Sequence, residues 1–183
     1  MSFKKNIPNI ITSLRILGTL CIIFLTPLKL PFFIAYTATG ATDVLDGLIA
    51  RLSHTTSDFG AKLDSVADLL FYSVSLIKLL PILWKTLPRF IWIIVALILI
   101  LRIISYIVSA VKFRKFASHH TILNKITGVS VFAIPYFMLS PFATFYCFAV
   151  CFVGFLSTAE DLYIHISAQS YDSNIKSAFK IAS

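Results

Sequence analysis

Long apolar runs separated by short polar turns make up most of this 183-residue chain. The runs predict membrane-spanning helices, because most of them reach the roughly 20 residues that a helix needs to cross a bilayer. The expected fold is all-α and integral to the membrane, with one domain over residues 1–183 and an interfacial segment over residues 1–15. Six spans are predicted, at residues 11–28, 31–51, 61–84, 90–111, 126–139 and 142–166.

The composition supports a membrane protein. Hydrophobic residues make up 58% of the chain and its mean hydropathy is +0.88, whereas a soluble domain is roughly 45–50% apolar. The net charge of +8 would suit nucleic-acid binding, but the basic residues flank the apolar runs and form no basic domain of their own. Cys21, Cys147 and Cys151 lie within apolar runs, so we expect packing residues and neither disulfides nor metal ligands.

The basic residues predict the topology. Six spans place both termini on one side of the membrane, and cytoplasmic loops carry an excess of lysine and arginine. Only Lys29, Lys85 and Arg89 fall at one face, and Lys78 and Arg102 fall within spans. We therefore expect both termini to be cytoplasmic, because the opposite face gathers the remaining basic residues: Lys4, Lys5, Arg15, Arg51, Lys62, Lys112, Arg114, Lys115, Lys125, Lys176 and Lys180.

Charged positions interrupt the apolar pattern mainly in residues 43–68, which read DVLDGLIARLSHTTSDFGAKLDSVAD. Asp43 and Asp46 are three apart and Asp64 and Asp68 are four apart, so each pair shares one helix face. If the two helices are neighbours, four carboxylates meet near the cytoplasmic interface, where they need a cation to offset their repulsion. Hard oxygen ligands suit Mg²⁺ or Mn²⁺, and two ions about 4 Å apart would clamp a phosphoryl group. A solvated loop is the alternative, but intramembrane carboxylates are costly and usually functional.

Small and basic residues accompany these aspartates. Gly47 and Ala50 keep one helix face small, which allows a base or a diphosphate to approach the backbone; close helix packing is the alternative. Arg51 offers a planar fork to phosphate oxygens, or it anchors the helix at the interface.

Written as a pattern, the stretch is D-x-x-D-G-x-x-A-R, then eight residues, then G-x-x-x-D-x-x-x-D. It resembles the CDP-alcohol phosphotransferase family of membrane enzymes, and all eight specified positions match. The resemblance implies that an alcohol hydroxyl attacks the β-phosphorus of a CDP-linked lipid and expels CMP. The matching positions are Asp43, Asp46, Gly47, Ala50, Arg51, Gly60, Asp64 and Asp68.

Roles for these positions follow from the resemblance alone. The four aspartates would hold two divalent ions, with Asp68 also acting as general base. The nucleotide site would be lined by Gly47, Ala50, Arg51 and Gly60. A homodimer is implied as well.

The opening NIPNIITSLR resembles that of bacterial phosphatidylglycerophosphate synthases, which adds Asn9 and Thr12 to the expected CDP-lipid site. This favours glycerol 3-phosphate as the acceptor and CDP-diacylglycerol as the donor. The later segment HTILNKITG departs from those enzymes, so serine and inositol phosphate stay open as acceptors.

Basic residues after the fourth span are candidates for the acceptor site. Arg102 lies within a span and must be paired or face a cavity. With Lys112 and Lys125 it could bind an acceptor that carries a phosphate; alternatively, Arg102 pairs with an aspartate and the lysines only set topology. His119 and His120 are adjacent and cannot share a helix face, so we do not expect them to be metal ligands.

Two functions from other classes compete with an enzyme. Clustered carboxylates also suit a divalent-cation transporter, although such a path gains nothing from Arg51. A non-catalytic assembly factor would not need a complete set of four aspartates.

Overall fold

The computed structural model describes residues 2–53, 58–114 and 121–168, without the side chains of residues 2–9, 43–53, 58, 59, 61 and 62. The described chain is helical and contains no strand, which confirms the predicted all-α fold. Among the residues with described side chains, three helical stretches are long and apolar enough to cross a membrane: Leu63–Thr86, Arg89–Phe113 and Ala143–Ser167. Shorter apolar stretches are Ile10–Phe24 and Ile122–Phe137. The helices are α1 (Ser2–Phe24), α2 (Leu30–Ser53), α3 (Asp58–Thr86), α4 (Arg89–Phe113), α5 (Ile122–Phe137) and α6 (Ala143–Ser167).

The starts of α1 and α5 differ most informatively from the predicted spans. Helix α1 begins at Ser2, so the segment expected at the interface is continuous with the first apolar run. Helix α5 begins at Ile122, before the predicted start at residue 126, because Thr121 caps it: the Thr121 side chain accepts a hydrogen bond from the Asn124 backbone N–H at 3.2 Å. Such caps satisfy one of the free N–H groups that every helix start leaves.

The chain divides into two compact units, Met1–Lys85 and Thr86–Ser183. The first contains α1 and α2 and nearly all of α3, and the second contains α4, α5 and α6. That the two units form a single membrane domain stays a prediction.

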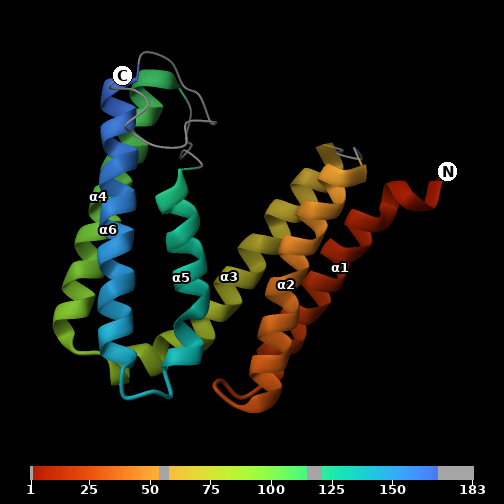
Figure 1. Ribbon diagram of the computed structural model, residues 1–183, viewed down its shortest axis with the longest axis horizontal. Helices are drawn as coiled ribbons and strands as arrows, with labels where there is room; N and C mark the ends of the chain where they lie inside the picture. The colour runs from red at the N-terminus through yellow and green to blue at the C-terminus, as the bar shows by residue number, and fades with distance from the viewer. Residues whose placement is uncertain (1, 54–57, 115–120, 169–183) are drawn as a thin grey trace. The chain divides into compact units, whose positions relative to one another are not determined.

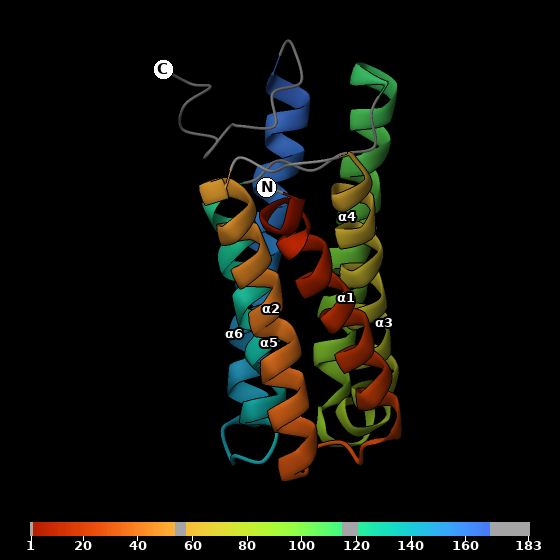
Figure 2. The ribbon, with the colours of Figure 1, turned by 90° about the vertical axis from the view of Figure 1, so that its right-hand side faces the viewer.

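In the first unit, α1 and α2 run side by side in opposite directions (Figures 1 and 2). The two helices pack closely at Gly18, where an added Cβ would overlap the Thr39 hydroxyl. Tyr36 of α2 stacks on Phe32 with 5.5 Å between ring centroids and meets Phe71 of α3 at 5.2 Å. All three rings are buried, so aromatic packing joins α2 to α3.

Lys78 of α3 binds the C-terminal end of α1. Its Nζ atom donates a hydrogen bond to the backbone carbonyl of Ile23 at 2.6 Å. The last carbonyls of a helix have no partner within the helix and carry partial negative charge. A lysine inside an apolar span is thus used as a cap for α1.

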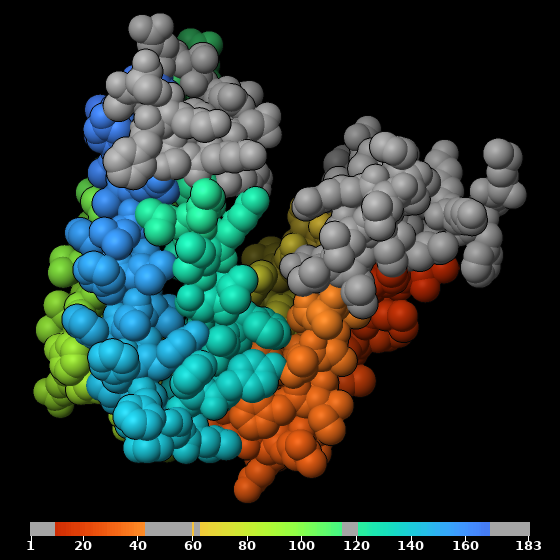
Figure 3. Space-filling view, viewed as in Figure 1, coloured from red at the N-terminus to blue at the C-terminus, as the bar shows by residue number. Residues whose placement is uncertain are grey.

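In the second unit, α6 packs against both α4 and α5 (Figure 1). Its glycine, Gly154, faces Thr127 of α5 and Ile98 of α4, where an added Cβ would lie 3.7 and 4.0 Å from them. The turn predicted at residues 140–141 joins α5 to α6, and beside it Tyr146 stacks on Phe137 at 3.8 Å. Figure 3 shows side chains of α5 and α6 in contact on the visible face.

Large apolar side chains cover the outside of these helices. On α4, Ile93, Leu97, Ile100 and Ile104 are all more than 40% exposed and lie at helical spacing on one face. Soluble proteins rarely expose apolar surface of this extent. The protein is therefore a membrane protein, with this face of α4 suited to lipid.

Candidate active site

Two of the predicted metal ligands converge on one atom in the first unit. The Nη1 atom of Arg15 donates hydrogen bonds to Asp64 Oδ1 at 2.8 Å and to Asp68 Oδ1 at 2.5 Å. Both carboxylates therefore lie on the same face of α3, as their spacing predicts. Their side chains are 43% and 36% exposed, so other groups can still approach them.

The spacing of polar residues in α1 places Arg15 on the face of the helix that contacts Asp64 and Asp68. Thr12, Arg15 and Thr19 recur at helical spacing and are all at least 97% buried, so they form a polar stripe on the inner face of an apolar helix. The Nε atom of Arg15 also lies 3.4 Å from the Thr42 hydroxyl of α2. A buried guanidinium is tolerated when it is paired and hydrogen-bonded, and here α3 supplies the carboxylates.

These carboxylates fit a divalent cation. They present hard oxygen donors, and the Arg15 nitrogen between them shows that the two oxygens favour positive charge at one shared point. Within the described side chains, no group of three or more His, Cys, Asp or Glu residues that could hold a metal ion is found. The side chains of Asp43 and Asp46, the other predicted ligands, lie outside the described residues.

The expected nucleotide-binding residues are described only in part. Three of them, Gly47, Ala50 and Arg51, lie on helix α2, and Asn9 lies on α1. The side chains at these four positions lie outside the described residues. Gly60 is half-buried near the start of α3. Thr12 is buried one turn before Arg15 and on the same face.

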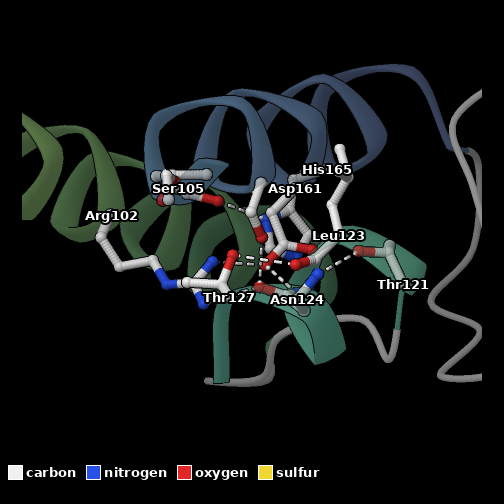
Figure 4. Close-up of polar contacts among 11 residues, drawn as sticks. Arg102, Ser105, Thr121, Leu123, Asn124, Thr127, Asp161 and His165 are labelled. Carbon is white, nitrogen blue, oxygen red and sulfur yellow. Dashed lines mark hydrogen bonds and ion pairs between the residues drawn. The ribbon is translucent and has the colours of Figure 1, made fainter. Parts of the chain in front are cut away.

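A second polar cluster joins the three helices of the second unit (Figure 4). Arg102 of α4 donates to Asp161 Oδ2 of α6 at 2.8 Å and to Asn124 Oδ1 of α5 at 3.0 Å. Asn124 donates in turn to Asp161 Oδ2 at 3.2 Å, and Ser157 donates to Asn124 Oδ1 at 2.6 Å. We call Arg102, Asn124, Ser157 and Asp161 the Arg102 cluster.

The Arg102 cluster explains how a charge is tolerated within an apolar helix. The Asp161 side chain is 1% exposed and that of Arg102 is 28% exposed. A buried carboxylate without a partner is strongly destabilising, so the ion pair and the amide of Asn124 are required together. The structure shows the pairing with an aspartate that was the alternative for Arg102, and the use of Arg102 in acceptor binding stays a prediction.

Lys112 and Lys125, the other two residues expected at the acceptor site, differ in their contacts. Lys112 donates to the carbonyls of His165 at 3.2 Å and Ile166 at 2.5 Å, which caps the end of α6. Lys125 is exposed, and its ammonium group makes no hydrogen bond or ion pair with the described residues. Ser105 of α4 and His165 of α6 share a 2.8 Å hydrogen bond and are both fully buried.

The sequence was also compared with known families and proteins. The sequence model of the family described as CDP-alcohol phosphatidyltransferase matches residues 5–163. The chain belongs to this family. A CDP-diacylglycerol–glycerol-3-phosphate 3-phosphatidyltransferase of Pseudomonas fluorescens is 44% identical over 93 residues, which cover 45% of this chain and 47% of that relative. The chain thus matches about half the length of this curated relative, and no solved structure matches it.

Membership of the CDP-alcohol phosphatidyltransferase family confirms the resemblance drawn from residues 43–68. It also confirms the predictions that the protein is an enzyme and that it acts in phospholipid synthesis. Both findings count against a transporter or an assembly factor. The motif of the family falls on α2 and α3, in the same unit as the Arg15 contacts.

Sequence reasoning missed three polar residues of this family member. Arg15 was assigned only to topology, although the spacing of Thr12, Arg15 and Thr19 was a usable signal. Asp161 and Asn124 were not named as the partners of Arg102. An acidic residue in the last apolar run was the available signal for Asp161, because Arg102 needs an opposite charge within the membrane.

Proposed function

We propose that this protein transfers the phosphatidyl group of CDP-diacylglycerol to glycerol 3-phosphate and releases CMP, with divalent cations bound by its aspartates. The observation that carries the proposal is the convergence of Asp64 and Asp68 on one positively charged point within the motif of the family. The printed activity of the Pseudomonas relative supports the acceptor.

The residues of the site have three roles in this proposal: cation binding, proton transfer and nucleotide binding. Asp64 and Asp68, together with Asp43 and Asp46, would hold Mg²⁺ or Mn²⁺. When bound, these cations offset the charge of the diphosphate and make its phosphorus more electrophilic. Asp68 takes the proton of the acceptor hydroxyl as its oxygen bonds to the β-phosphorus, and the bond from that phosphorus to the CMP oxygen breaks. The nucleotide is bound by Asn9, Thr12, Gly47, Ala50, Arg51 and Gly60.

The proposal includes a place in the cell. The basic residues favour cytoplasmic termini, so the aspartates would face the cytoplasm from within the cell membrane. The lipid donor would reach them sideways from the bilayer and the soluble acceptor from the cytoplasm. The two units would act as one domain, in a homodimer as the family resemblance implies.

Cation dependence is the first expected result of this proposal. Purified protein in detergent micelles should release CMP from CDP-diacylglycerol and glycerol 3-phosphate when Mg²⁺ or Mn²⁺ is present. Excess EDTA should stop the release, because uncompensated carboxylates repel the diphosphate, and excess cation should restore it. Release that continues at the full rate in EDTA would contradict the assigned role of the aspartates.

The acceptor site is tested by a charge-balanced pair of substitutions. Arg102 is 28% exposed and Lys125 of α5 is exposed, so each charge is accessible to a phosphorylated acceptor. In the double variant R102Q/D161N no buried carboxylate is left without its partner. We expect the KM for glycerol 3-phosphate to rise about 10-fold or more, the range of a lost charge-assisted hydrogen bond, with the KM for CDP-diacylglycerol unchanged.

The matched control is K85Q, at the opposite predicted face, which should change neither KM. K125Q should raise the KM for glycerol 3-phosphate in the same way as the double variant. If both acceptor variants keep the wild-type KM, Arg102 only holds helices together and the acceptor binds elsewhere.

A further inference from the structure

We propose that Arg15 is a built-in counter-ion: in the cation-free protein its guanidinium occupies the place of a divalent ion between Asp64 and Asp68, and it leaves when the ion binds. This inference rests on the proposed function only in taking these two aspartates as cation ligands.

The contacts of Arg15 exclude a cation bound to the same two carboxylate oxygens. A single nitrogen, Nη1, lies at hydrogen-bond distance from one oxygen of each carboxylate, at 2.8 and 2.5 Å. A Mg²⁺ ion bound to the same two oxygens would sit at about 2.0–2.1 Å from them. Cation and guanidinium would then overlap and would also repel each other, so one must leave.

Charge and burial explain why an arginine stands there. Two carboxylates one turn apart repel each other, and an opposite charge between them offsets the repulsion. Arg15 is 1% exposed, so its own charge also needs these partners. Each therefore stabilises the other in the cation-free protein.

Outside the two carboxylates, Arg15 also contacts α2. Its Nε contact with the Thr42 hydroxyl is 3.4 Å long, which is weak for a hydrogen bond. Once displaced, the guanidinium needs a new anionic partner. The diphosphate of the CDP-lipid would supply phosphate oxygens beside the aspartates, and arginine binds these well.

The test measures Mn²⁺ binding to substrate-free protein in micelles, followed by the EPR signal of free Mn²⁺. The variant R15M removes the charge and keeps a long side chain. It should bind Mn²⁺ at least about fivefold more tightly than wild type, the factor that one unit charge at 4 Å exerts even in water. Addition of Mn²⁺ should also raise its melting temperature more than that of wild type.

The matched control is K78M. Lys78 also joins α3 to α1 by a strong hydrogen bond, but to the carbonyl of Ile23 and not to a carboxylate. Loss of helix packing alone would affect both variants alike, whereas relief of competition should tighten Mn²⁺ binding only in R15M.

Displacement of the Arg15 guanidinium is measured in the wild-type protein. This measurement tests the inference even if R15M does not fold. In protein labelled with ¹⁵N-arginine, the Arg15 guanidinium signals, assigned from R15K, should shift and sharpen when Mg²⁺ is added, because Nη1 loses both carboxylates. Unchanged signals at saturating Mg²⁺, or an unchanged or weaker Mn²⁺ affinity in R15M, would overturn the inference while leaving CMP release intact. Absence of Mn²⁺ binding in both proteins would overturn this inference and the proposed cation dependence together.

Discussion

Replacing Asp68 by asparagine should lower the rate of CMP release by about 100- to 10,000-fold, the range that a general base contributes. Asparagine keeps the size of the side chain and can still accept a hydrogen bond from Arg15, but it cannot take a proton. Binding of CDP-diacylglycerol should persist, because the other aspartates still hold cations. The rate and the binding are measured separately, by CMP release and by equilibrium titration with CDP-diacylglycerol.

The variant D64N is the matched comparison on the same face of α3. Asp64 contacts the same Arg15 nitrogen as Asp68, and we assign it to cation binding alone. Activity lost in D64N should therefore return at high Mn²⁺ concentration, whereas activity lost in D68N should not. A D68N protein that works at the wild-type rate, or that high Mn²⁺ rescues, would remove Asp68 from the role of base.

The second large effect concerns the stability of the second unit. Replacing Arg102 by alanine should lower the free energy of unfolding by about 3–5 kcal/mol, the cost of leaving a buried charge without its partner. Asp161 is the stranded group, with a side chain only 1% exposed. Thermal or denaturant unfolding in micelles measures the change.

The double variant R102Q/D161N separates stranded charge from lost packing. It removes both charges and keeps polar groups that can contact Asn124, so most of the stability should return. K85A, at an exposed position in the last turn of α3, should change the free energy of unfolding by no more than about 0.5 kcal/mol. If the double variant is as unstable as R102A, the ion pair does not account for the stability of this unit.

The sequence allowed the prediction of features that repeat along one helix. Each of the six predicted apolar runs overlaps a helix in the part of the chain that the structure describes. The spacing of Asp64 and Asp68 placed both carboxylates on one face, because the helical period fixes which residues are neighbours. The family motif was found for the same reason, since its spacing is local. Asp43 and Asp46 stay predictions, with side chains outside the described residues.

Contacts between helices could not be predicted in the same way. Arg15 and Asp68 are 53 residues apart and Arg102 and Asp161 are 59 apart, and no local period relates them. Their pairing depends on which helix faces pack together, which the apolar pattern does not specify when most faces are apolar. The start of α5 at Ile122 was also not predicted, because the polar pair Asn124 and Lys125 interrupts the sequence just before the apolar run at residue 126.

The most direct test of the account is CMP release from CDP-diacylglycerol by the purified protein with Mn²⁺, with glycerol 3-phosphate, serine and inositol phosphate supplied one at a time. We predict release with glycerol 3-phosphate alone, in equal amount with a phosphatidylglycerophosphate product identified by mass spectrometry. Release with serine or inositol phosphate but not with glycerol 3-phosphate would contradict the proposed acceptor, and no release with any of the three would contradict the proposed reaction.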